Sequence, residues 1–423
     1  MRILFVAAGE VASGEIITAL HMAETLAAKG CGVRILASPY ACGFLRGLFP
    51  GLITEFGPDL AQNQSVWINT IREFVPDVVV FADYPLLFFS SGASRLADDS
   101  WVSSLANLDA ALVTLDHIGY AQKSIHIYFG PPHLSFHSQT TPCLPGRMHV
   151  LLPCPMQEPN PVEGRHGQPF RYWDVPLTMN DDVRQEIRRK YLRDENGLLI
   201  FHSISNWAWK IADVFNLPYY EYLPRLLGHY LSELPRSVTV VSVNNGNLLS
   251  ATEVPRVHIL NLAALPRNEY DQLLMASDLV ITENGISSTL GKAICGLQPC
   301  AVLRNTFTLP DLLREVTEPV RTTVMAMETE RLGSIFPFEV FPIWGSSELD
   351  ALGLFSQNSV SSAFAQLEIF GGLATQQLFQ NLLISAESRE SLREQQSAYV
   401  RRVQALPDSY DALQIIIQRG KHN

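Results

Sequence analysis

Short apolar runs alternate with longer segments of mixed polarity along both halves of this 423-residue chain. The apolar runs of the first half are residues 1–8, 33–37, 78–82 and 111–115, and those of the second half are residues 198–201, 238–243, 257–260, 279–281 and 301–303. Runs of this length that are apolar at most of their positions are typical of strands buried on both faces of a parallel sheet.

The segments between these runs carry the signals of helices. Helices are predicted for residues 16–29, 67–74, 181–193, 270–276 and 290–295, and near the C-terminus for residues 363–367, 376–384, 387–403 and 410–419. Gly30 and Gly296 directly follow two of these segments, and Gly is common where a helix ends. Strands that alternate with helices indicate an α/β fold, so we predict two doubly wound, Rossmann-like domains that face each other across a cleft.

A stretch rich in Pro, His and aromatic residues separates the two alternations. It covers residues 120–176 and predicts an irregular segment that becomes an interdomain linker at about residues 153–176. We therefore expect an N-terminal domain of residues 1–175, a second domain of residues 176–345, and a helical C-terminal part of residues 346–423.

Composition and charge narrow the class of protein. An apolar content of 47% with 17% charged residues is typical of a globular protein with a sizeable core. The net charge of −11, without a basic stripe, argues against nucleic acid or an anionic membrane as the main partner.

The cysteines and histidines give no signal of a metal site. The six cysteines form no CxxC pair, which indicates buried free thiols in a reducing compartment. His133 and His137 have the spacing of a helical metal pair, but Pro131-Pro132 and the missing carboxylate or Cys partner argue against a metal. No apolar run reaches transmembrane length, and the N-terminus lacks the features of a signal peptide. We expect a soluble cytoplasmic protein.

The stretch of residues 278–299 carries the clearest candidate site. A buried strand is followed by the turn Glu283-Asn284-Gly285, and then by the hydroxyl residues Ser287, Ser288 and Thr289, which favour a helix start. The start of a helix has unpaired backbone N–H groups at the positive end of its dipole, where phosphates bind. An ordinary strand–helix connection has the same pattern, so the pattern alone leaves both interpretations open.

The same stretch resembles the donor-site signature of GT-B glycosyltransferases, whose plant and antibiotic-tailoring members carry Thr-His-x-Gly-x-x-Ser-Thr-Leu and then Gly-x-Pro. The matching residues are Thr282, Gly285, Ser288, Thr289, Leu290, Gly296 and, with one extra residue before it, Pro299. Two positions depart from the signature. The His that touches the diphosphate in the family falls on Glu283, and the Glu that holds the ribose falls on Gly291. A carboxylate that faces a diphosphate is unfavourable unless it turns away or is protonated.

This resemblance implies the metal-independent transfer of a sugar from a UDP- or dTDP-activated donor to a small-molecule acceptor, as in natural-product biosynthesis. No cofactor is implied beyond this co-substrate, and a homodimer is compatible with it. The first domain would bind the acceptor and the second the donor, while the C-terminal helices would close back toward the first domain. The implied donor-site residues are Ser203, Leu265, Glu283, Asn284, Gly285, Ser287, Ser288 and Thr289. Glu368 lies where a carboxylate could replace the one lost at Gly291.

The loop after the first strand lacks GxGxxG, which argues against a dinucleotide site. It resembles the acceptor-side loop of GT-B enzymes. Ser13-Gly14-Glu15 lies as far before Gly30 as the Gly-Gly-His of the peptidoglycan N-acetylglucosaminyltransferase lies before its helix-closing Gly. With one residue inserted, the loop also resembles that of the lipid-A-disaccharide synthase. The residues implied for this loop are Gly9, Glu10, Ser13 and Gly14.

Three side chains are candidates for acid–base catalysis: Glu15, Asp116 and His117. Glu15 would lie at a helix start, where it could instead complement the helix dipole, an effect that lowers its pKa and opposes a role as general base. Asp116 and His117 follow a strand and could hold or deprotonate an acceptor hydroxyl. Asp83 also follows a strand and is assigned to the acceptor side, although an Asp at such a position more often caps the next turn.

Two other classes of function stay open. A nucleotide-sugar epimerase or hydrolase on the same fold would act on the donor without an acceptor. A non-catalytic partner of a glycosyltransferase would fit the departures at Glu283 and Gly291.

Overall fold

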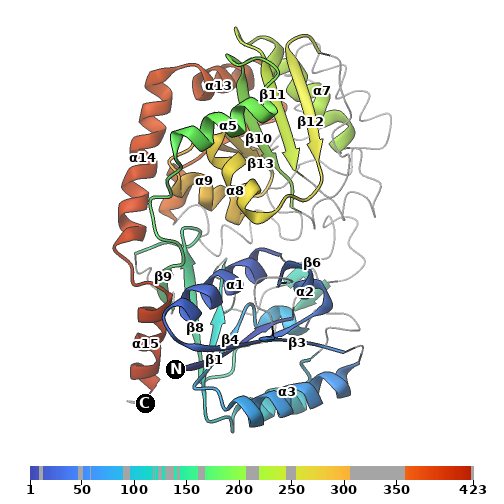
Figure 1. Ribbon diagram of the computed structural model, residues 1–423, viewed down its shortest axis with the longest axis vertical. Coiled ribbons are helices and arrows are strands. Elements are labelled where there is room, and N and C mark those ends of the chain that lie inside the picture. The colour runs from blue at the N-terminus through green and yellow to red at the C-terminus, as the bar shows by residue number, and fades with distance from the viewer. Residues whose placement is uncertain are drawn as a thin grey trace.

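Two parallel β-sheets, each flanked by helices, lie one above the other in this protein (Figure 1). The computed structural model describes residues 1–8, 13–45, 51–57, 59–88, 96–117, 119, 121, 126–128, 138–140, 143–160, 167–205, 219–243, 254–304 and 358–420. The expected α/β fold with two doubly wound sheets is confirmed.

The first sheet has seven parallel strands in the order β3-β2-β1-β4-β5-β8-β9. They are β1 (Arg2–Ala7), β2 (Gly32–Ala37), β3 (Ile53–Glu55), β4 (Val78–Phe81), β5 (Ala111–Leu115), β8 (Met148–Cys154) and β9 (Gln168–Arg171). The helices of this half are α1 (Ser13–Ala28), α2 (Pro39–Leu45), α3 (Leu60–Phe74), the 3₁₀ helix η1 (Pro85–Phe88) and α4 (Asp99–Leu105). A separate antiparallel pair is formed by β6 (His126–Tyr128) and β7 (Ser138–Thr140).

The second sheet has six parallel strands in the order β12-β11-β10-β13-β14-β15. They are β10 (Leu198–Ser203), β11 (Val238–Val243), β12 (Val257–Leu262), β13 (Leu279–Thr282), β14 (Cys300–Arg304) and β15 (Ala365–Glu368). The helices around it are α5 (Asp181–Tyr191), α7 (Tyr219–Ser232), α8 (Arg267–Ala276), α9 (Ser288–Cys295), the 3₁₀ helix η4 (Ser359–Ser362) and α13 (Leu373–Leu383). In Figure 1 the arrowheads of β11 and β12 point toward the first sheet, and that of β8 points toward the second.

The last two helices connect the halves. Helix α14 (Ala386–Gln404) packs on α9 and α13 of the second half, and α15 (Ser409–Gly420) packs on α1, β5 and β9 of the first. Lys29 at the end of α1 pairs with Asp408. The Arg171 guanidinium donates to the carbonyl oxygens of Gln404 at 2.9 Å and Leu406 at 2.8 Å.

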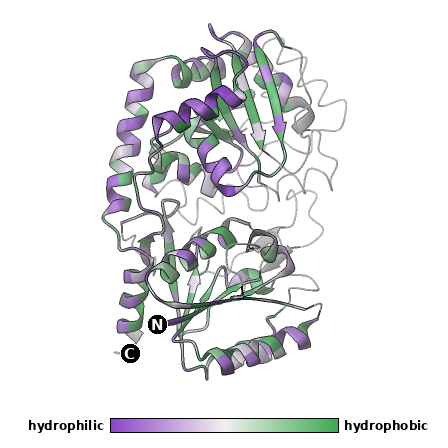
Figure 2. Ribbon diagram, viewed as in Figure 1, coloured by the Kyte–Doolittle hydropathy of each residue, from purple (hydrophilic) through white to green (hydrophobic). Residues whose placement is uncertain are grey.

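The alternation of side chains along β10 shows how the second sheet is buried on both faces. Leu199 and Phe201 belong to one apolar cluster, whereas Leu198 and Ile200 belong to another on the opposite face. Figure 2 shows apolar strands inside and strongly polar surfaces on α5 and α14. Polar residues that end such a strand therefore also divide between the two faces.

One predicted helix is wrong. The residues expected to form a helix at 363–367 lie mostly in β15, which pairs in parallel with β14, so the part from residue 346 onward is not purely helical. Leu367 is fully buried beside Leu303, and this packing outweighs the local helix signal.

The expectation that residues 120–176 form an irregular segment is also wrong in part. Residues 148–154 and 168–171 form β8 and β9 of the first sheet, so the region expected to be a linker contains two sheet strands. Pro153 lies near the end of β8 and Pro169 in the edge strand β9, which are positions where a strand tolerates the missing N–H of proline.

None of the described helices is both long and apolar enough to cross a membrane. Among the same residues, no group of three or more His, Cys, Asp or Glu side chains is arranged to hold a metal ion.

Candidate functional site

The order in which the chain adds strands to the second sheet reverses between β10 and β13. The chain continues from β10 to its neighbour β11 on one side, and from β13 to β14 on the other. The first sheet has a corresponding point between β1 and β4. In open α/β sheets, ligands bind outside the carboxyl ends of the strands at such points. The residues that follow β10, β13, β1 and β4 are therefore the candidates for binding.

Helix α9 begins beside the end of β13, as the sequence predicts. Ser287 is its N-cap, with an extended backbone and a side-chain oxygen that accepts from the N–H of Leu290 at 3.0 Å. The Gly291 N–H donates to the Ser287 carbonyl at 3.1 Å. Among the described residues, no acceptor is found for the backbone N–H groups of Ser288 and Thr289. These two groups lie at the positive end of the helix and are available to an anion.

The turn between β13 and α9 is shaped by Asn284. Its side-chain oxygen accepts from the Ile286 N–H at 3.0 Å, and its side-chain nitrogen donates to Ser205 Oγ at 3.1 Å. Its own N–H donates to Thr282 Oγ1 at 3.2 Å. The Asn284 side chain thus holds the turn, with the buried Gly285 next to it, so that α9 starts at the sheet edge.

Three hydroxyl groups meet on one face of the second sheet. The Tyr270 hydroxyl of α8 lies 2.7 Å from Ser203 Oγ at the end of β10 and 2.6 Å from Thr289 Oγ1 in the first turn of α9. Burial raises the pKa of Tyr270, so the phenol keeps its proton. This group joins two expected site residues with Tyr270, which the sequence argument did not single out. Leu265 lies half-buried just before α8, on the same face of the sheet.

Glu283 is bound to a histidine on the neighbouring strand. Its Oε1 lies 2.8 Å from Nε2 of His202, and Nδ1 of His202 lies 3.0 Å from Ser242 Oγ. His202 is completely buried, and Glu283 is 4% exposed. Glu283 Oε2 is also buried, but it has no hydrogen-bond partner among the described residues.

Among the described residues, the two cations nearest in sequence after Glu283, Lys292 and Arg304, pair with other carboxylates. Lys292 pairs with Asp271, and Arg304 Nε lies 2.7 Å from Oε1 of Glu368. A residue that follows a strand lies closest to the ends of the adjacent strands, and β10 places His202 there. The ion pair with Arg304 also occupies Oε1 of Glu368, the carboxylate that was expected to replace the ribose-binding Glu.

The packing around Gly291 explains the second departure from the glycosyltransferase signature. A Cβ at this position would lie 2.9 Å from Cγ of Pro155 and 3.0 Å from Sδ of Met156. This face of α9 is therefore covered by the segment that follows β8. A Glu at position 291 would have no space for its side chain.

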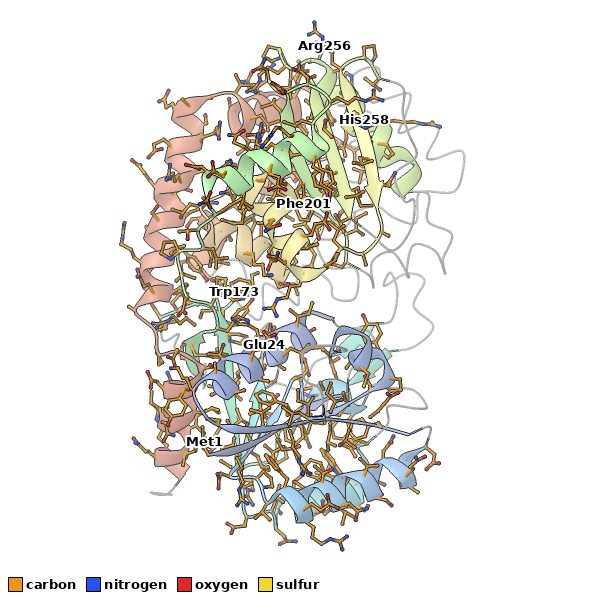
Figure 3. All side chains as sticks on the ribbon, viewed as in Figure 1. Met1, Glu24, Trp173, Phe201, Arg256 and His258 are labelled. Atoms are coloured by element: carbon orange, nitrogen blue, oxygen red, sulfur yellow. The ribbon has the colours of Figure 1, made fainter. Side chains whose placement is uncertain are left out.

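Contacts between the two halves of the protein lie close to Gly291 and to the starts of α8 and α9. Trp173 and Glu24 both lie between the sheets in Figure 3. Lys292 Nζ lies 5.6 Å from the centre of the Trp173 ring. Arg267, at the start of α8, donates to Glu24 Oε2 and to His21 Nδ1, each at 2.8 Å. The two halves are thus joined by apolar and charged contacts close to the starts of α8 and α9.

In the first half, Glu15 lies in the first turn of α1 together with Ser13 and Gly14. Glu15 is half-buried, and burial raises its pKa, in contrast to the lowering expected from the helix dipole alone. The desolvation of the carboxylate outweighs the effect of the helix start. Gly9 and Glu10, the other two residues of the expected acceptor loop, lie outside the described residues, as do His133 and His137.

Asp83 and Asp116 both hold backbone turns. Asp83 Oδ1 accepts from the Leu86 N–H at 3.0 Å at the start of η1. The Asp116 carboxylate accepts from the N–H groups of Gly119 at 2.7 Å and Ala121 at 3.0 Å. These bonds give both aspartates a structural role at the end of their strands.

His117 is buried without a partner for its ring. Neither ring nitrogen has a hydrogen bond to any residue that the structure describes, and the side chain is 8% exposed. Burial lowers the pKa of His117 to about 3, so the ring is neutral near pH 7. A neutral imidazole can both donate to and accept from a bound hydroxyl.

His117 should make the stability of the protein fall in acid. The unfolded chain binds a proton at this residue near pH 6.5, whereas the folded chain does so only near pH 3. The contribution is therefore complete above pH 6.5 and is lost as the pH falls toward 3, with a slope of at most about 1.4 kcal/mol per pH unit. Urea unfolding should show that the wild type loses about 1–2 kcal/mol more than His117→Asn between pH 6.5 and 5. Equal losses in the two proteins would contradict this burial effect.

The architecture of two facing doubly wound sheets, joined by a C-terminal helix pair, is that of the GT-B fold. Solved structures with this fold match over nearly the whole chain. The spinosyn forosaminyltransferase SpnP is 14% identical with a TM-score of 0.57, and the match covers 100% of this chain and 99% of that one. The spinosyn rhamnosyltransferase SpnG, complexed with thymidine diphosphate, is 14% identical with a TM-score of 0.53 and coverages of 98% and 100%. A proposed UDP-N-acetylglucosamine 2-epimerase from Listeria monocytogenes is 11% identical with a TM-score of 0.51 and coverages of 100% and 96%.

Residues 22–421 match the family of unknown function DUF6365, and the chain belongs to this family. No curated protein matches the sequence. The similarity to the solved structures is at the level of the fold, which both transferases and an epimerase share.

Proposed function

We propose that this protein transfers a sugar from a nucleotide-activated donor to a small-molecule acceptor. The observation that carries the proposal is the start of α9, where the N–H groups of Ser288 and Thr289 are available to a diphosphate at the point where the second sheet changes direction. The GT-B fold, and its occurrence in a transferase complexed with thymidine diphosphate, support this assignment.

The start of α9 would act on the leaving group. Negative charge develops on the phosphate as the bond to the sugar breaks, and fixed N–H groups stabilise it without having to reorganise. In this proposal the helix end supplies the positive potential that a metal ion supplies in other enzymes. The hydroxyls of Ser203, Tyr270 and Thr289 lie beside the helix start and hold it in place.

Glu15 would accept a proton from the acceptor. Because burial raises its pKa, the carboxylate is a stronger base than an exposed glutamate. The neutral ring of His117 would orient the acceptor hydroxyl by a hydrogen bond to one of its free nitrogens. Asp116 would position His117 through the turn that it holds.

Calorimetry with the purified protein tests the proposal. We expect UDP or dTDP, and their sugar conjugates, to bind and to raise the thermal stability. A ligand at a hundred times its Kd should stabilise the folded protein by about 2.7 kcal/mol. If no nucleoside diphosphate and no nucleotide-sugar binds or stabilises the protein, the proposed function is wrong.

The likeness to a proposed epimerase supports a second candidate, the conversion of a nucleotide-sugar without an acceptor. The two candidates differ in a simple incubation. An epimerase or hydrolase consumes the donor alone, whereas a transferase needs the acceptor. A protein that binds the donor and converts it under neither condition would be the non-catalytic partner considered from the sequence.

A further inference from the structure

Glu283 holds a buried carboxylate oxygen that no described residue binds. The residue is 4% exposed, its Oε1 is bound by His202 at 2.8 Å, and its Oε2 is buried without a partner. Buried carboxylate oxygens are normally satisfied, because a buried polar atom without a hydrogen bond costs about 1–3 kcal/mol or more. This oxygen lies at the point where the second sheet changes direction, so a ligand is the natural source of the missing donor.

The side chain is held in one orientation by its neighbours. His202 Nδ1 lies 3.0 Å from Ser242 Oγ, and His202 and Ser242 lie opposite each other in the register of β10 and β11. In the tautomer whose Nδ1 accepts from the Ser242 hydroxyl, Nε2–H donates to Glu283 Oε1. Oε2 of Glu283 has no donor among the described residues, and a carboxylate oxygen accepts hydrogen bonds. The group that completes the site must therefore be a donor.

Two polar groups lie on opposite faces at the end of β10. His202 follows Ile200 on the face packed with α7 and α13, whereas Ser203 follows Phe201 on the face packed with α8 and α9. The start of α9 attracts an anion on the second face, while Oε2 of Glu283 offers an acceptor from the first. A ligand that satisfies both carries an anionic group next to a hydrogen-bond donor.

We propose that Glu283 Oε2 binds a hydroxyl or amino group on the sugar of the donor, and that His202 is its positioning residue. This inference rests on the proposed function, in which the diphosphate of the same molecule lies at α9. The diphosphate itself is excluded as the partner of Oε2, because two negative groups in contact at a partly desolvated site repel each other. Glu283 thus selects the sugar and not the nucleotide.

Glu283→Gln removes the charge and keeps the shape of the side chain. We expect the affinity for a nucleotide-sugar to fall about tenfold or more, as when a hydrogen bond to a charged group is lost, while the affinity for the nucleoside diphosphate stays within about twofold. Glu390→Gln, at an exposed position of α14, makes the same chemical change away from the site and should alter neither affinity. Both ligands are measured by calorimetry on each protein.

His202→Gln tests the positioning role, and should weaken nucleotide-sugar binding in the same direction as Glu283→Gln with a smaller effect. The ring nitrogens of His202 in the wild type give a readout that needs no variant. Their NMR resonances should shift when nucleotide-sugar binds, and shift less when the diphosphate alone binds. This measurement decides the proposal if a variant does not fold.

The outcomes separate this inference from the function on which it rests. If the wild type binds neither ligand, the proposed function fails. If the wild type binds the diphosphate, and Glu283→Gln weakens both ligands equally or neither, the role of Glu283 fails while the diphosphate site at α9 stands. Unchanged His202 resonances with a bound nucleotide-sugar would also overturn the proposal.

Discussion

Gly291→Glu is expected to lower the free energy of unfolding by about 3–5 kcal/mol, the range typical of an unpaired charge forced into a packed interior. Position 291 faces the ring of Pro155 and the side chain of Met156, where even a Cβ would come within 2.9–3.0 Å. A proline ring cannot move aside without its backbone. The added carboxylate would therefore either lose its water or push the segment after β8 away from α9.

Urea unfolding measures this effect, and Gly43→Ala is the matched control. Gly43 is also a helical glycine, but a Cβ there would meet nothing within 4 Å. The control should be neutral or more stable by about 0.5–1 kcal/mol, since Ala has a higher helix propensity than Gly. A fully stable Gly291→Glu protein would mean that α9 and the segment after β8 are not in contact in solution.

Ser288→Pro is expected to weaken the binding of a nucleoside diphosphate by about 10- to 150-fold while the protein stays folded. Ser288 is the first residue of α9, and proline is well tolerated at this position because its N–H takes no part in the helix. Ser287 has an extended backbone, φ −73° and ψ 144°, which suits a residue before proline. The substitution deletes one of the two N–H groups offered to the ligand. A hydrogen bond to a charged group contributes about 1.5–3 kcal/mol, which corresponds to the expected loss of affinity.

Asp181→Pro gives the equivalent change at a distant helix. Asp181 is the first residue of α5, and the N-cap Asn180 is also extended. This control should leave diphosphate binding unchanged. Full binding by a folded Ser288→Pro protein would show that the start of α9 does not hold the phosphates, whatever the protein binds elsewhere.

Much of the fold could be predicted because each strand carries its own signal. The run at residues 78–82 is apolar throughout and contains β4, and the hydroxyl residues before Leu290 start α9 as expected. Strands buried on both faces need such continuous apolar sequences, and a helix start needs a residue that caps it. Both requirements act within a few residues, so they are visible in the sequence.

The rest depends on partners that are distant in the chain. β15 forms only because β14 offers an edge to residues 365–368, and no local signal reveals this. The pairing of Glu283 with His202 joins residues 81 positions apart, although His202 lies near the end of β10 and Glu283 directly follows the adjacent strand β13. Given the strand order, the polar residues at the ends of β10, β11 and β13 could have been placed together.

The contact between β9 and the C-terminal segment has a consequence for the synthesis of the protein. β9 is the edge of the first sheet, and its Arg171 is bound by the carbonyl of Leu406, 235 residues later in the chain. At about 5–20 residues per second, a ribosome would take roughly 12–47 seconds to make the intervening chain. During this time the nascent first half has an unprotected edge, which is the type of surface that pairs wrongly with other chains. The first sheet is thus the earliest part of the molecule to be made and among the last to be completed.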